Sequence, residues 1–195
     1  MKILLHICCA PCSIHPFKEL LKGGDHQITG FYFNPNIHPY QEYVNRRSAL
    51  EEYSRAAGLP VVFPGYEPHV FFRKVAYHEQ APMRCRSCWQ MRLEAAAQYA
   101  ARNGFDAFTT TLLISPYQDH LVVKEIGEGL ASRSGVPFYY RDFRTGFRES
   151  QDEARRHNLY RQNYCGCIYS EIERFRDTQA TRKIRNPKLK ILNKC

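Results

Sequence analysis

Short apolar runs alternate with longer amphipathic segments along the first 140 residues of the chain. The amphipathic segments carry apolar residues at helical spacing and stop at glycine, as at Gly58, Gly104 and Gly135. The apolar runs are typical of buried strands, and they cover 2–8, 27–33, 59–63, 105–111 and 136–140. This order predicts an α/β fold with about five mostly parallel strands and helices on both faces.

The chain has no internal repeat and no linker long enough to divide it. Its 195 residues, 44% of them hydrophobic, suit a single domain with one core. We expect an α/β core over 1–140 and a helical extension over 141–195, which carries Cys165-Gly166-Cys167 and a basic tail. The apolar run after Lys2 is too short for a secretory signal, and no stretch approaches the ~18 apolar residues of a membrane span. A cytoplasmic protein without membrane contact is therefore expected.

Cysteines are the most informative residues of the chain. Three groups are separated by long stretches, and they read Cys8-Cys9-Ala10-Pro11-Cys12, Cys85-Arg86-Ser87-Cys88 and Cys165-Gly166-Cys167. Thiols stay reduced in the cytosol, so these groups favour metal or redox chemistry over disulfides. The first group follows the first strand directly, and ligand sites of open α/β sheets lie at the carboxyl ends of strands. We expect the fold to bring all three groups to one metal centre.

The number of thiols exceeds what one four-coordinate metal can use. Four cysteines fill a [4Fe–4S] cluster, and the remaining three can hold one more metal with an open position. Zinc sites that only stabilise the fold are the alternative, and spacing alone leaves iron–sulfur and zinc open. Cys195, the last residue, is interpreted as a bystander.

The motifs HICCAPCS, CRSCWQMRL, LLISPYQDH and YRQNYCGCIYS, in this order between residues 6 and 170, resemble those of the QueH family. These are cobalamin-independent epoxyqueuosine reductases. The resemblance implies a Rossmann-like fold related to the PP-loop (HUP) group and the reduction of epoxyqueuosine to queuosine in the wobble nucleotide of tRNA, the last step of queuosine synthesis. It also implies a [4Fe–4S] cluster beside a separate mononuclear iron.

Carried onto this chain, the resemblance implies cluster ligands Cys8, Cys9, Cys85 and Cys88, and second-iron ligands Cys12, Cys165 and Cys167. The electron donor is expected to be of ferredoxin or flavodoxin type. PP-loop enzymes place a glycine-rich phosphate loop where this chain has CCAPCS. Because Pro11 has no N–H to offer a phosphate, we expect no use of ATP.

Proton donors and RNA contacts are harder to assign from the residues. Tyr117, Asp119 and Tyr164 lie near the expected site and are candidate proton donors, with packing or helix capping as the alternative uses. A net charge of +9 suits a polyanionic partner such as tRNA, although it also serves solubility. The candidate tRNA-binding residues are basic: Arg46, Arg47, Arg161, Arg182, Lys183, Arg185, Lys188 and Lys190.

Two other functions fit parts of the sequence. A PP-loop-like iron–sulfur tRNA sulfurtransferase would share the fold, the cysteines and the tRNA, but it needs the missing glycine-rich loop. A zinc-stabilised RNA-binding module explains the thiols and the basic residues, but not why so many thiols gather at strand ends.

Overall fold

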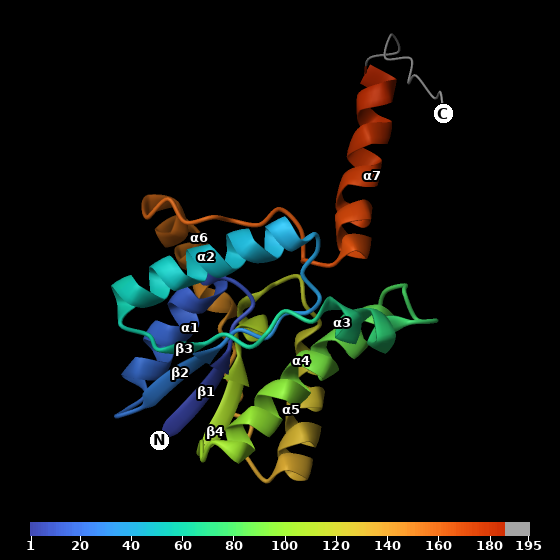
Figure 1. Ribbon diagram of the computed structural model, residues 1–195. Helices are drawn as coiled ribbons and strands as arrows, with labels where there is room; N and C mark the ends of the chain where they lie inside the picture. The colour runs from blue at the N-terminus through green and yellow to red at the C-terminus, as the bar shows by residue number, and fades with distance from the viewer. Residues whose placement is uncertain (186–195) are drawn as a thin grey trace.

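A parallel four-stranded sheet forms the centre of the computed structural model, which describes residues 1–185 (Figure 1). The strands are β1 (Lys2–His6), β2 (Gln27–Phe31), β3 (Val61–Val62) and β4 (Ala107–Thr110). Their order in the sheet is β3-β2-β1-β4, with every neighbouring pair parallel. The predicted α/β fold with a mostly parallel sheet is confirmed.

The expected fifth strand over 136–140 is reduced to a single parallel bridge between Phe108 and Phe138. Phe108 N–H donates to the Pro137 carbonyl at 3.0 Å, and Tyr139 N–H donates to the Phe108 carbonyl at 2.8 Å. Pro137 has no N–H of its own, so the ladder does not extend further on that side.

Helices cover both faces of this sheet. One face carries α1 (Ala10–Lys22), α2 (Tyr40–Ala57) and α6 (Phe147–Arg156), and the other carries α4 (Met83–Arg102) and α5 (His120–Ser134) (Figure 1). Helix α3 (Pro68–Val75) packs against α4, and short 3₁₀ turns cover Thr111–Ile114 and Arg144–Gly146. Helix α7 (Ile168–Arg185) projects away from the body (Figure 1). None of the helices in the described part of the chain is long and apolar enough to cross a membrane.

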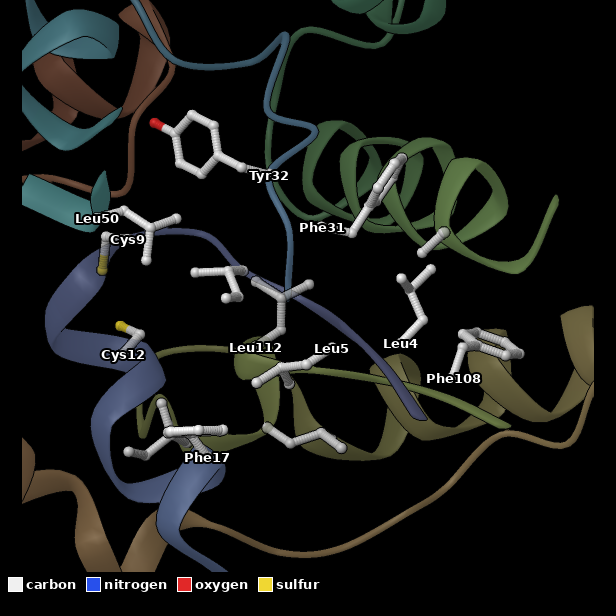
Figure 2. Packing of buried hydrophobic residues seen from close by; sticks show 14 of the residues in the cluster. Leu4, Leu5, Cys9, Cys12, Phe17, Phe31, Tyr32, Leu50, Phe108 and Leu112 are labelled. Carbon is white, nitrogen blue, oxygen red and sulfur yellow. The ribbon is translucent and has the colours of Figure 1, made fainter. Parts of the chain in front are cut away.

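The core is built on β1, whose residues from Ile3 to His6 are fully buried. Successive strand residues face opposite sides of the sheet, and Figure 2 shows Leu4 beside Phe31 and Phe108 while Leu5 faces Phe17. Burial on both faces explains the unbroken apolar run of this strand. The strand therefore ends in a rigid position immediately before the first cysteine group.

Two helices carry cysteines close to their starts. Helix α1 begins at Ala10, because Pro11 is tolerated in a first helical turn. Helix α4 begins at Met83, directly after Pro82. As a result Cys12, Cys85 and Cys88 all lie in the first two turns of helices.

Candidate metal centre

The cysteines of the first group form a compact cluster where β1 passes into α1. The sulfur atoms of Cys8, Cys9 and Cys12 all lie within 4.8 Å of one another, and those of Cys8 and Cys9 are 3.8 Å apart. Cys9 is the extended residue before the helix and Cys12 lies in its first turn, so the sharp turn lets adjacent side chains converge. Figure 2 shows the sulfurs of Cys9 and Cys12 facing the same space at the helix start.

Two polar side chains that the sequence did not single out hold this three-thiol cluster. Thr111, which directly follows β4, accepts from the Cys8 backbone N–H at 3.1 Å and donates its hydroxyl to the Cys8 sulfur at 3.3 Å. The side-chain amide of Gln162 donates to the Cys9 sulfur at 2.9 Å from 153 positions away. A hydroxyl residue at a strand end, such as Thr111, is a sequence signal for contact with a site at that edge. The sequence does not show that β4 lies beside β1, so it could not identify Cys8 as the partner.

Protonation of the three-thiol cluster is uneven. Hydrogen bonds from the Cys12 and Cys9 thiols lower the pKa of Cys8 well below its usual value. Burial raises the pKa of Cys9 to about 12, and the hydrogen bond to Cys8 raises the pKa of Cys12. Without a cation, this cluster therefore favours only one thiolate, at Cys8. Three close sulfurs, two of them on buried cysteines, need a cation to ionise together, and they fit a metal ion of the kind that thiolates bind.

The other four thiols come from α4 and from the segment just before α7, and they interact by charge. Cys88 and Cys167 belong to one buried cluster with Phe71, Val75 and Met91. Burial raises the pKa of Cys88 to about 12, and negative charge on Cys165 and Cys167 would raise it further. Burial raises the pKa of Cys85 as well, and the same two cysteines add to it. Thiols more than 75 positions apart along the chain therefore influence one another by charge, and a single metal centre for all three groups stays a prediction.

The segment that carries Cys165 and Cys167 is fixed to the start of α2. Arg46 donates from Nη1 to the Cys165 carbonyl at 2.9 Å and from Nη2 to the Tyr164 carbonyl at 3.0 Å. The His38 N–H donates to the Gly166 carbonyl at 2.8 Å. Gly166 has a φ of +145°, which residues with a side chain rarely adopt. With the loop fixed in this way, Cys167 packs with Cys88 and Met91 of α4, and the Cys165 sulfur lies 3.8 Å from the Gln118 amide.

The three candidate proton donors occupy different environments. Asp119 caps α5, accepting from the Val122 N–H at 3.1 Å. The Tyr164 hydroxyl donates to the His38 carbonyl, and burial raises its pKa. Tyr117 is 83% exposed, with its ring edge against Phe147. Two of the three side chains therefore already have a structural use.

The candidate tRNA-binding residues also differ in exposure. Arg46 is buried and paired with Glu42 at 2.7 Å, so its contacts within the protein favour a positioning role over a phosphate contact. Arg47 pairs with Glu51 at 2.8 Å and Arg161 is exposed. Arg182, Lys183 and Arg185 fall in the last turns of α7, where the backbone alone is described, and Lys188 and Lys190 lie outside the described residues.

The comparison with solved structures identifies a neighbour of the same fold. A crystal structure described as a predicted subunit of tRNA methyltransferase from Methanocaldococcus jannaschii superposes with a TM-score of 0.55 at 12% identity, over 80% of this chain and 76% of that one. At this identity the likeness shows the fold alone.

The comparisons of sequence are more specific. The family model described as "Epoxyqueuosine reductase QueH" matches residues 3–173. The protein of that name from Dehalococcoides mccartyi is 39% identical over 89% of this chain and 94% of its own length. Those from Acinetobacter baylyi and Thermotoga maritima are each 34% identical, over 94% and 88% of this chain and 87% and 91% of their own lengths. The chain therefore belongs to the QueH family of epoxyqueuosine reductases.

Proposed function

We propose that this protein reduces epoxyqueuosine to queuosine in the wobble nucleotide of tRNA. The observation that carries the proposal is the compact cluster of Cys8, Cys9 and Cys12 directly after β1 in a QueH-family chain. The thiols of Cys85, Cys88, Cys165 and Cys167, which interact by charge, support it. Opening the epoxide to an alkene consumes two electrons and two protons and releases one water. A site that performs this needs a one-electron carrier and a group that binds oxygen, and thiolates from this chain can hold both.

Proximity favours a division of the thiols that differs from the one implied by the resemblance. Cys8, Cys9 and Cys12 would hold the separate iron, because three ligands leave a position open for substrate. The four others would hold a [4Fe–4S] cluster, since this cluster takes four thiolates, and they are Cys85, Cys88, Cys165 and Cys167. When bound, these groups would supply electrons one at a time and a Lewis acid for the departing oxygen.

The chain's own residues would position the ligands and supply protons. Thr111 and Gln162 hold the Cys8 and Cys9 sulfurs in place by the hydrogen bonds described above. The Gln118 amide lies 3.8 Å from the Cys165 sulfur, and its oxygen accepts from the Trp89 indole N–H at 2.7 Å. Protons would come from Tyr117, Asp119, Tyr164 or solvent; Tyr117 is the most exposed of the three side chains.

Recognition of tRNA would use the basic surface around this site. Exposed Arg47 and Arg161 and the basic tail after Gln179 would contact phosphates, and the strong positive charge of the chain would steer the polyanion. The donor of electrons would be a ferredoxin or flavodoxin, and the protein would act in the cytoplasm, where thiols remain reduced.

The direct test is an anaerobic assay with epoxyqueuosine-containing tRNA, iron-loaded protein and a chemical reductant. We expect queuosine to form in proportion to the iron content. Iron-loaded protein that leaves the nucleoside unchanged would overturn the proposal. ATP consumption with formation of a thiolated nucleoside would favour the sulfurtransferase, and RNA binding by a zinc-loaded, redox-inactive protein would favour the binding module.

A further inference from the structure

One buried positive charge near the thiols lacks a carboxylate partner. Arg46, Arg84 and Arg92 are the buried arginines of the described residues, each at most 3% exposed. Arg46 pairs with Glu42 at 2.7 Å and Arg84 pairs with Glu173 at 2.8 Å. Within the described part of the chain, no carboxylate lies within 4.0 Å of Arg92. A buried guanidinium without an anion is costly, so this charge calls for a balancing group.

The position of Arg92 indicates what that group is. Arg92 lies four residues after Cys88 on α4 and therefore on the same helical face. Its Nη2 donates to the Asn34 side-chain oxygen at 2.7 Å, and the Asn34 amide donates to the Ile7 carbonyl at 2.8 Å, next to Cys8. Its Nε atom is buried without a partner among the described residues. The side chain thus reaches from the four-thiol side of the site to the three-thiol side.

The geometry places the Arg92 charge beside both groups. Arg92 lies on the same face of α4 as Cys88, and Asn34 connects its guanidinium to the carbonyl of Ile7, the residue before Cys8. Negative charge on sulfurs of either group would therefore be balanced by the same cation.

We propose that Arg92 is the counter-charge of the whole metal–thiolate centre: held by Asn34 between the two thiol groups, it balances their negative charge and raises the reduction potential of the cluster. Arg92 is a positioning residue in this role, since it acts through the thiolates. The inference rests on the proposed function for the presence of the centre. In this role a single cation links the two thiol groups electrostatically, which none of the cysteines does.

The test compares reduction potentials of iron-loaded variants by anaerobic redox titration, followed by visible absorbance. We expect Arg92→Met to shift the midpoint potential to more negative values. A tenfold change in the reduction equilibrium, the smallest effect expected, corresponds to about 59 mV for one electron. Arg92→Lys keeps the charge and should recover most of the shift. Arg102→Met removes an exposed charge about 15 Å further along the same helix and should leave the midpoint unchanged.

A second variant covers the case in which Arg92→Met does not fold. Asn34→Asp places a carboxylate against the guanidinium without changing side-chain size, so it should also shift the midpoint to more negative values. An unchanged midpoint in a folded Arg92→Met or Asn34→Asp protein would overturn the inference, as would an equal shift in Arg102→Met. Failure of the proposed function would give a different result. Iron-loaded wild-type protein would then not convert the tRNA nucleoside, regardless of the midpoint potentials of the variants.

Metal-free protein gives an independent readout. Without metal the guanidinium has little anionic charge to balance, so Arg92→Met should melt at the same temperature as the wild type or higher. With iron bound, the variant should gain less thermal stability than the wild type. An equal gain on iron loading in the two proteins would contradict the role of Arg92.

Discussion

The Nη1 atom of Arg46 donates to the carbonyl oxygen of Cys165 at 2.9 Å, although the two residues are 119 positions apart in the chain. This contact attaches the last cysteine pair to α2, and Glu42 holds the guanidinium from the other side. Arg46, whose charge suggests a phosphate contact in the sequence, therefore supports the segment that carries Cys165 and Cys167.

Replacing Arg46 by leucine should destabilise the fold strongly. The change leaves the Glu42 carboxylate buried without its cation and frees the Tyr164 and Cys165 carbonyls, at a cost of about 3–5 kcal/mol. The free energy of unfolding from urea titration measures this loss. Arg47→Leu removes the exposed neighbour and should change stability by less than about 1 kcal/mol. Equal losses in the two variants would show that Arg46 does not support the loop.

Gly166→Ala should cost about 1–3 kcal/mol and lower the occupancy of the four-thiol site. The backbone φ of +145° is unfavourable for alanine, and the new Cβ would lie 3.3 Å from atoms of Arg46, Asn36 and Ile37. Iron content and urea unfolding measure the two effects. Gly129→Ala is the matched control, because its Cβ meets nothing within 4 Å and alanine favours the helix. A Gly166→Ala protein with full iron content would contradict the role of the turn.

The parallel α/β fold and the place of the first cysteine group directly after a strand followed from the sequence. Apolar periodicity is a local signal, and ligand sites of such sheets lie at the carboxyl ends of strands. The partners Thr111, Gln162 and Asn34 did not follow from the sequence, because their roles depend on which strands are neighbours. The burial of Arg46 could not be predicted either, because the charge of a residue does not show whether the fold buries it.

His38 should make the protein less stable as the pH falls. Burial against Phe71 and Phe72 lowers its pKa to about 4, below the 6.5 of an unfolded chain. Between these two pKa values the unfolded state binds more protons than the folded state. The contribution of His38 to stability is therefore present above pH 6.5 and is lost as the pH falls toward 4. From about pH 7 to about pH 5.5 this loss is about 1 kcal/mol. His38→Gln should flatten the pH dependence of urea unfolding by this amount, and an unchanged pH dependence in this variant would contradict the role of His38.

Deletion of the residues after Arg182 should weaken tRNA binding and reduce its dependence on salt. The removed segment contains Lys183, Arg185, Lys188, Lys190 and Lys194 and no acidic residue. Each lost phosphate contact lowers the slope of log affinity against log salt by about 0.7–0.9. Binding titrations at several salt concentrations measure the slope. A truncated protein with an unaltered slope would show that the tail makes no phosphate contacts.

Single cysteine replacements separate the two ways of dividing the thiols between the metals. If proximity governs, Cys12→Ser removes a ligand of the separate iron and should abolish turnover while most of the cluster absorbance remains. Cys88→Ser should remove that absorbance, because Cys88 is buried among the four-thiol group. Anaerobic absorbance spectra and iron content measure both, with Cys195→Ser as the control that should retain turnover. Loss of absorbance in Cys8→Ser, together with its retention in Cys165→Ser, would instead support the division implied by the sequence resemblance.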